Sequence, residues 1–363
     1  MATIYDVAKA SGVSPKTVSR VINNESAVKK STKDKVNKAI ARLGYVPSTA
    51  ARALRSHKSG LVGLITGAIS LAPSRSEAHG LPDLFIVQGV QKAMEASGKT
   101  LLIADTGGQM DRVPQLIRTF EEHRVEGIIY AADYHRRVQL PPVLHSVKLV
   151  LANCYDDVGT PAVLPDDYRG QLSLTQSLIA KGHRKIAYLT LGPRLDATIQ
   201  RARGYRDALE RAGISFDQKY LISADIDSPD DATEEQLLWD ALDRVLALPA
   251  PPTVICFGND RMAVRAYGIL RSRGLSLPDD ISVAGYDNYK LITQTLYPTL
   301  TSAELPYAAI GIRATELLLD MINGTAEAPA EPVLVSGAVS FGNSVKTLPT
   351  PITNISSIGR TTK

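Results

Sequence analysis

The first sixty residues carry apolar side chains at helical spacing in three short segments. Apolar residues separated by three or four positions predict amphipathic helices. Thr3 and Asp6 have the spacing of a capping box before the first segment, and Ser14 is a suitable N-cap for the second. Ser31 and Asp34 are the expected N-terminal signals of the third. The three helices are therefore predicted at about residues 4–11, 15–22 and 32–43.

From residue 61 to residue 346, short apolar runs alternate with longer amphipathic segments. The runs predict buried strands, and the segments between them predict helices. Strands are expected over residues 61–65, 100–104, 127–131, 148–152, 185–190, 253–257 and 281–284. Helices are expected around residues 85–96, 113–123, 168–180, 199–212, 234–248, 260–273 and 307–322. This alternation indicates parallel sheets covered on both faces, and the number of units favours an α/β body of two lobes.

Positive charge is concentrated at the N-terminal end of the chain. Residues 1–60 contain twelve Lys and Arg against three Asp and Glu, a net charge of +9, although the whole chain of 363 residues carries only +4. The remaining 303 residues therefore carry −5. A basic head on a mildly acidic body predicts a polyanionic partner for the head alone.

Several classes of protein find no support in the sequence. The two cysteines, Cys154 and Cys256, provide neither a disulfide framework nor a zinc ligand set. No dinucleotide-binding, P-loop or nucleophile-elbow motif is present, so we expect no enzyme, cofactor or metal. Polar residues follow Met1 where a signal peptide would be apolar, and no apolar run reaches 18 residues. We therefore expect a cytoplasmic protein that does not enter the membrane.

The three predicted helices form a helix-turn-helix unit, because a short turn containing Gly12 joins the first two. The second helix of such a unit enters the DNA major groove, where Lys16 and Arg20 could bond guanine. The same polar residues could instead be the solvated face of a small bundle. The candidate DNA-binding residues are Thr3, Tyr5, Ser14, Pro15, Lys16, Thr17, Ser19, Arg20 and Asn23.

Two stretches of the head carry a family resemblance. TIYDVAKASGVSPKTVSRVIN at residues 3–23 and LGYVP at residues 43–47 closely resemble the N-terminal signature of lactose-repressor-type bacterial transcription factors. The resemblance implies that residues 47–56 form a hinge helix, which folds when two subunits bind DNA. It also implies that Leu54 is a wedge that opens a base step of the minor groove. Leu54 could alternatively anchor the hinge to the body.

Residues that follow the predicted strands are the candidates for ligand binding, because ligands of parallel sheets lie at the carboxyl ends of the strands. Amides, carboxylates and an Arg at these ends can recognise hydroxyl groups, and Tyr can lie against a sugar ring. The family resemblance assigns effector contacts to residues within RARGY at 201–205, GNDRMA at 258–263 and VAGYDN at 283–288. The candidate effector residues are Tyr134, His135, Asn153, Arg201, Asn259, Asp287 and Tyr307.

Each of these assignments has an ordinary structural alternative. Asn259 and Asp287 could cap the next helix, and Arg201 could lie on a helix surface. His135 could cap a helix or bond within the core, and Tyr307 could pack in the core. The resemblance places Arg201 and Asp287 at opposite walls of one cleft between the lobes.

The chain departs from the family pattern in two places. Residues 68–82 form a longer loop than is usual after the first strand, and Gly342 stands where relatives commonly have Arg. The predicted domains are a DNA-binding head at 1–46, a hinge and linker at 47–60, a body at 61–346 and a disordered tail at 347–363. Within the body, the N-lobe is predicted to contain 61–164 and 301–331, and the C-lobe to contain 165–300 and 332–346.

These features together predict a transcriptional repressor that binds a pseudo-palindromic double-stranded DNA operator. We expect a homodimer, or a higher oligomer, controlled by a small sugar-like effector through coupling between the two sites. The alternative is a non-specific or architectural DNA-binding protein whose sensor domain is vestigial.

Overall fold

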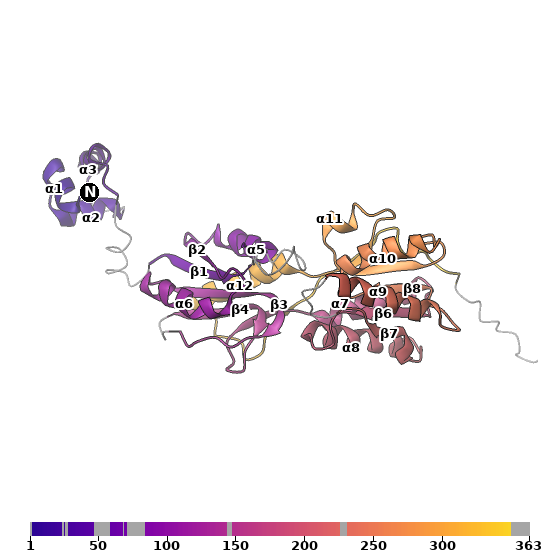
Figure 1. Cartoon of the computed structure of the whole chain (residues 1–363). Coiled ribbons are helices and arrows are strands. Elements are labelled where there is room, and N and C mark those ends of the chain that lie inside the picture. Colours follow the sequence, from indigo (N-terminus) through magenta and orange to yellow (C-terminus); the bar gives the residue numbers. More distant parts are fainter. Residues whose placement is uncertain are drawn as a thin grey trace, which may run out of the picture. The chain divides into compact units, whose positions relative to one another are not determined.

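The computed structural model describes residues 2–23, 25, 28–46, 59–67, 69, 70, 84–143, 147–225 and 231–349. The chain divides into two compact units, a head at Met1–Leu61 and a body at Val62–Lys363. Figure 1 shows a helical first unit and a second unit in which helices cover the sheets. The predicted hinge segment at 47–58, with Leu54, lies outside the described residues, as do most of the loop at 68–82 and the tail from residue 350.

The head contains the helices α1 (Ile4–Ser11), α2 (Pro15–Ile22) and α3 (Lys30–Leu43). The capping box of α1 is present, with the Thr3 N–H 2.8 Å from the Asp6 carboxylate. Gly12 then ends this helix in the left-handed conformation. The three helices enclose a small core that contains Val7, Ala8, Val18, Val21, Val36 and Ala39.

The predicted start of the third helix is wrong by about half a turn. Helix α3 begins at Lys30, and its N-cap is Lys29, whose side chain makes no capping bond. The Lys29 carbonyl accepts hydrogen bonds from the backbone N–H groups of Thr32 and Lys33. The hydrogen bonds of the first turn therefore begin at the Lys29 carbonyl, two residues before Ser31. Ser31 and Asp34 consequently lie inside the helix and do not cap it.

The body contains two six-stranded sheets. The first has the order β11 (Val333–Val335), β5 (Ala162–Pro165), β4 (Lys148–Tyr155), β3 (Gly127–Arg137), β1 (Leu61–Thr66) and β2 (Thr100–Asp105). The second has the order β12 (Val339–Ser340), β10 (Thr301–Glu304), β9 (Ser282–Asp287), β8 (Val254–Phe257), β6 (Ile186–Thr190) and β7 (Leu221–Ser223). The described pairs are parallel except β10 with β12, which confirms the predicted two-lobed α/β body.

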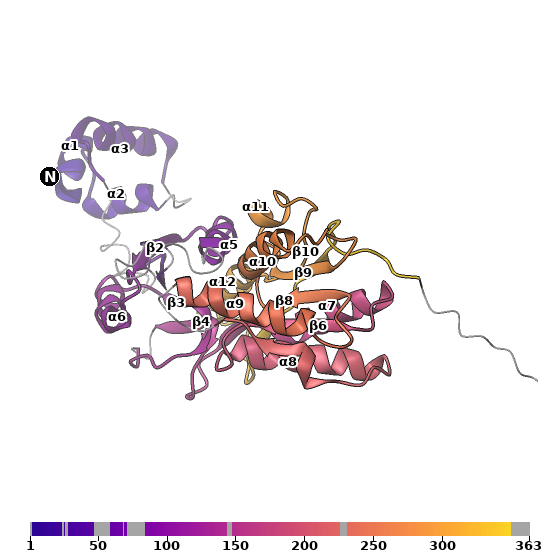
Figure 2. The ribbon, with the colours of Figure 1, turned by 45° about the vertical axis from the view of Figure 1, so that its right-hand side comes forward.

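Helices cover the sheets as the apolar periodicity predicts. The first sheet is covered by the helices α5 (Leu84–Met94), α6 (Val113–Glu122) and α12 (Tyr307–Asn323). One face of the second sheet meets α7 (Asp167–Ala180) and α8 (Asp196–Arg211), and the other meets α9 (Asp231–Leu246) and α10 (Asp260–Ser272). Figure 2 shows α8 and α10 on opposite sides of the second sheet. Short connecting elements are η1 (Met110–Arg112), η2 (Gln218–Tyr220) and α11 (Lys290–Thr293).

Two segments belong to the lobe opposite to the one predicted. Strand β10 lies in the second sheet, although residues 301–331 were expected in the N-lobe, and β11 lies in the first sheet, although residues 332–346 were expected in the C-lobe. The sequence of β10 is polar, and its buried Ser302 hydroxyl donates to Asp260 at 2.6 Å. Apolar periodicity does not reveal such a strand. The chain thus leaves the first sheet after β5, returns after β10 and leaves it again after β11.

Gly342 has a structural reason in this chain. A Cβ atom at this position would lie 2.3 Å from the Thr299 carbonyl oxygen, so the two backbone segments approach too closely for any side chain. The Gly342 N–H also donates to the Thr301 hydroxyl at 3.0 Å. An Arg could not occupy this position without a shift of the backbone.

Among the described residues, no helix has both the length and the apolar character needed to cross a membrane.

Candidate functional site

The second helix of the head presents its predicted DNA-binding residues to solvent. Lys16 and Arg20 are exposed on α2, and Arg20 also pairs with Glu25 at 3.4 Å. Ser14 caps the helix through the Thr17 N–H at 3.2 Å, and the two hydroxyl groups lie 2.9 Å apart. Side chains held in this way keep a fixed orientation for contacts with phosphate.

The other candidate residues of the head lie around the same helices. Thr3, Tyr5 and Asn23 are exposed, and Pro15 and Ser19 are partly exposed. Thr3 belongs to the capping box of α1, so its side chain already has a structural role. Tyr5 is 71% exposed, which is unusually high for an aromatic residue. Its ring is therefore accessible to a binding partner.

In the body, Tyr134 and His135 lie within β3 and not beyond its end. This strand is longer than predicted and continues to Arg137 after an irregular register between Ala131 and Arg136. The last residues of β3 are mostly polar, so they lack the apolar pattern from which strands are predicted, and the strand was predicted too short. The Tyr134 ring lies 4.8 Å from the guanidinium of Arg136.

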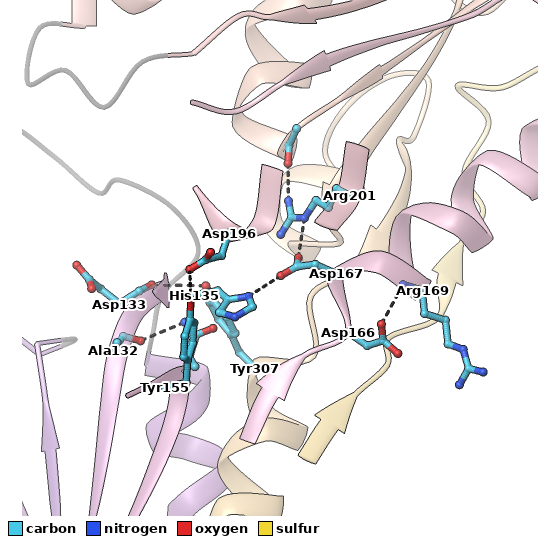
Figure 3. Close-up of polar contacts among 12 residues, drawn as sticks. Ala132, Asp133, His135, Tyr155, Asp166, Asp167, Arg169, Asp196, Arg201 and Tyr307 are labelled. Atoms are coloured by element: carbon cyan, nitrogen blue, oxygen red, sulfur yellow. Dashed lines mark hydrogen bonds and ion pairs between the residues drawn. The ribbon is translucent and has the colours of Figure 1, made fainter. Parts of the chain in front are cut away.

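His135 connects the two lobes. Its Nδ1 lies 2.9 Å from the carboxylate of Asp167, the first residue of α7. A second connection lies nearby, where the Tyr155 hydroxyl donates to Asp196 at 3.2 Å, and the rings of His135 and Tyr155 meet edge to face. Figure 3 shows both connections. The strand ends of the first lobe thus contact the N-terminal turns of α7 and α8.

Asn153 and Tyr307 lie beside these connections on the side of the first lobe. Asn153 is fully buried in the left-handed backbone region, and its amide nitrogen donates to the Ala132 carbonyl at 3.1 Å. The oxygen of the same amide has no hydrogen-bond partner. Tyr307 is buried at the start of α12, and its hydroxyl donates to the Asp133 carbonyl at 3.5 Å.

Arg201 is a buried ion-pair partner and not a surface residue. It is only 3% exposed, and its Nε donates to Asp167 at 2.7 Å. Another guanidinium nitrogen donates to the Gly258 carbonyl at 2.7 Å, and the Tyr286 ring lies 3.6 Å away. Burial raises the pKa of Asp167, but the charge of Arg201 and the hydrogen bond of His135 outweigh it, so the pKa lies below its usual value. Asp167 is therefore an ionised bridge between Arg201 and His135.

Asn259 and Asp287 end two strands of the second lobe. Asn259 caps α10 by accepting the Met262 N–H at 2.8 Å, which is the structural alternative considered for it. Asp287 ends β9 with a φ of 115°, a strained conformation for a residue with a side chain. Arg201 and Asp287 both belong to the second lobe, within the predicted C-lobe at 165–300, because α8 and β9 pack together there. Their placement at opposite walls of one cleft stays a prediction.

Two neighbouring carboxyl groups of the second lobe resist ionisation. Burial raises the pKa of Asp260 to about 7, although its carboxylate accepts hydrogen bonds from Ser302 and from the Tyr289 N–H. Burial, followed by the charge of Asp260, also raises the pKa of Asp287 well above its usual value. The charge of Arg201 acts against this shift. Asp260 is therefore partly protonated near neutral pH, and its titration is linked to that of Asp287.

The sequence reasoning missed Asp167, Tyr155 and Asp196. Asp167 lies two residues after β5, so its position past a strand end would have identified it if this four-residue strand had been recognised. We call His135, Asn153, Tyr155, Asp167, Asp196 and Arg201 the inter-lobe cluster. In the described part of the chain, no three His, Cys, Asp or Glu residues are arranged to hold a metal ion.

Comparison with known proteins identifies the family. The model of the lacI family of bacterial regulatory proteins matches residues 3–48, and the model of the periplasmic binding protein-like domain matches residues 175–345. The transcriptional repressor PurR of Vibrio atlanticus is 32% identical over 326 residues, covering 89% of this chain and 92% of the relative. The ribose operon repressor of Escherichia coli K12 is 33% identical, covering 89% and 93%. The chain belongs to the lacI family.

Solved structures of lacI-type regulators share the fold. A putative regulator from Rhizobium etli is 31% identical with a TM-score of 0.69, and the match covers 80% of this chain and all of the other. The lac repressor dimer bound to operator and an anti-inducer has a TM-score of 0.72, covering 95% and 99%, but at 24% identity it supports the fold alone. Within this lacI-family chain, the inter-lobe cluster lies where two parallel sheets present their carboxyl ends, the usual ligand position of α/β folds.

Proposed function

We propose that this chain is a sequence-specific DNA-binding transcriptional repressor controlled by a small sugar-like effector. The observation that carries the proposal is the combination of a basic helix-turn-helix head with a body whose two lobes meet at buried polar groups. Relatives named as repressors of the sucrose and ribose operons support it. We further propose that the protein acts in the cytoplasm and has no enzymatic activity.

The head is proposed to recognise a pseudo-palindromic operator as part of a homodimer. Ser14, Pro15, Lys16 and Arg20 would lie over base edges, where Lys16 and Arg20 can bond guanine. The proposed phosphate contacts are Thr3, Tyr5, Thr17, Ser19 and Asn23. Leu54 in the hinge segment would act as a wedge in the minor groove. Two-fold symmetry of the dimer would then be matched by two half-sites in the DNA.

The body is proposed to control the head by a difference in ligand affinity between two arrangements of its lobes. His135 and Tyr155 of the first lobe bond to Asp167 and Asp196 of the second, so a ligand that competes for these groups changes the balance between the arrangements. Asn153, Arg201, Asp287, Tyr134 and Tyr307 are the further proposed contacts, while Asn259 would act by capping α10. A coupling of about 1–3 kcal/mol suffices for roughly 5–150-fold control of DNA affinity.

Selection of binding sites from random double-stranded DNA tests this proposal with the full chain. We expect a single pseudo-palindromic sequence, with an affinity at least about a thousandfold above that for unrelated DNA at physiological salt. Thermal-shift screening of sugars, polyols, sugar acids and nucleosides would then identify a compound that changes operator affinity. Enrichment without a shared sequence would indicate the alternative, an architectural DNA-binding protein with a vestigial sensor.

A further inference from the structure

The positive charge of Arg201 in the inter-lobe cluster is paired within the protein, with the carboxylate of Asp167. The Arg201 guanidinium donates hydrogen bonds to the Asp167 carboxylate and the Gly258 carbonyl, and one of its faces lies against the Tyr286 ring. Three of its possible contacts are therefore already made. The neighbouring Arg136 is likewise paired with Asp133 at 2.9 Å. The Arg201 guanidinium therefore faces Asp167 and not an incoming carboxylate or phosphate, which are the groups that Arg binds most strongly.

Negative groups exceed positive groups on the second-lobe side. Asp287 lies near Arg201, and Asp260 lies near Asp287, while Arg201 is already neutralised by Asp167. Burial raises the pKa of both carboxyl groups, because the region around them is poorly solvated. A second anion placed here would enter a poorly solvated region in which the charge of Arg201 is already paired, which is strongly unfavourable.

Two buried polar atoms lack partners beside the paired charges. The Asn153 side chain is fully buried with its amide oxygen unbonded, and the Thr198 hydroxyl, one turn before Arg201 in α8, is also buried and unbonded. An unpartnered buried acceptor costs free energy unless a ligand or water supplies a donor. Hydroxyl groups are the simplest ligand groups that can both donate to the amide oxygen and exchange bonds with Thr198.

We propose that the inter-lobe cluster selects an uncharged polyhydroxylated ligand, and that Asp167, by occupying Arg201, is the residue that excludes sugar acids and sugar phosphates. This inference rests on the proposed function, since it names the class of effector that the repressor would sense. Asp167 thus determines specificity by removing a charge from the site.

Matched ligands test this directly with the full chain. Glucose, galactose and ribose are titrated by calorimetry beside glucuronate, galacturonate and ribose 5-phosphate, with glucosamine as a cationic probe. Whichever sugar binds is expected to do so at least tenfold more tightly than its anionic form and no less tightly than its amino form. A preference of the wild-type protein for any anionic member, or for glucosamine over glucose, would overturn the proposal.

A variant test does not depend on the identity of the sugar. Inorganic phosphate is the probe, and Asp167→Asn frees Arg201 while keeping the side-chain shape. We expect saturable phosphate binding at least tenfold tighter in Asp167→Asn than in the wild-type chain, without a gain in Asp167→Glu. Asp243→Asn removes a carboxylate of the same charge from a surface pair with Arg273 and is expected to bind phosphate as the wild type does.

Equal phosphate affinity in wild type and Asp167→Asn would show that Arg201 is not masked, and the proposal would fail. The titration of wild-type protein with matched sugars keeps the test decisive if Asp167→Asn does not fold. Failure of the repressor assignment itself has a different signature, which is the absence of a shared operator sequence in the DNA selection.

Discussion

Most of the described charged side chains of the head are exposed to solvent, whereas Arg201 and Asp167 of the inter-lobe cluster in the body are buried and paired. In the head, Lys16 and Arg20 extend into solvent from a small helical unit with a net charge of +9 over residues 1–60. In the body, Arg201 is only 3% exposed and lies against a carboxylate, a carbonyl and an aromatic ring. A long polyanion is bound by many solvent-exposed positive side chains. A small ligand is bound by a few buried polar groups whose positions are fixed. One chain can therefore contain two binding sites whose responses to solution conditions differ.

Salt provides the sharpest way to separate the two regions. Operator affinity is expected to fall by about 10³–10⁵-fold between 50 and 200 mM salt if roughly 6–10 phosphates are contacted, because bound counterions are released. Binding of an uncharged sugar to the body is expected to change less than about twofold, because its paired charges are buried and weakly screened. Parallel titrations by fluorescence anisotropy and calorimetry measure both. A flat response of operator binding would remove the head from its assigned role.

Arg201→Ala tests whether the body depends on internal charge pairing. The substitution leaves the Asp167 carboxylate buried without its main partner, so the free energy of unfolding of the body is expected to fall by about 3–5 kcal/mol. Urea denaturation of the full chain measures the effect. Arg203→Ala is the matched control, since this exposed residue of the same helix only lies over the Tyr168 ring, and it should cost less than about 1 kcal/mol. Equal losses in both variants would contradict the distinction between buried and solvated charge.

Lys16→Ala examines the solvated side of the comparison. An exposed Lys at the start of the recognition helix is expected to discriminate one operator position by about 1–3 kcal/mol. Affinities for a set of single-base operator variants measure the change. Lys38→Ala on α3 is the control and should weaken all operators alike. The same uniform loss in Lys16→Ala would mean that Lys16 contacts phosphate and not base edges.

The buried carboxyl pair of the body predicts a pH effect of smaller size. The pKa of Asp260 is raised from 3.8 in the unfolded chain to about 7 in the folded chain, so its contribution to stability decreases as pH rises through this window. Between pH 6 and pH 8 the loss is about 1 kcal/mol. Asp260→Asn lacks this titration, and the difference in unfolding free energy between it and wild type should change by that amount. A difference that is the same at both pH values would contradict the shift.

Much of the fold could be predicted from the sequence, because its long amphipathic helices and apolar strands have clear periodicities. The α8 and α10 helices and the buried strands β6 and β8 follow from such patterns. The short strands β5, β7, β10, β11 and β12 were missed. Their position is fixed by tertiary hydrogen bonds, including that from the Thr301 N–H to the Ser344 hydroxyl.

The candidate residues were predicted better than their relationships. Arg201 and His135 were named from the sequence, but the Asp167 carboxylate that joins them was not, because pairs far apart in sequence leave no local signal. The ends of parallel strands indicate where ligands bind, not which side chains neutralise one another. Partner identity at such a site requires the three-dimensional structure.

The order in which the chain visits its two sheets limits how such a protein can be rearranged by recombination. The head ends at Leu61, so one junction would transfer its DNA specificity to another body as a continuous segment. The lobes are interleaved, because the chain passes between the sheets after β5, after β10 and again after β11. Exchange of a single lobe therefore requires several simultaneous junctions. The head and the whole ligand-binding body can thus be exchanged at one junction, whereas a single lobe cannot.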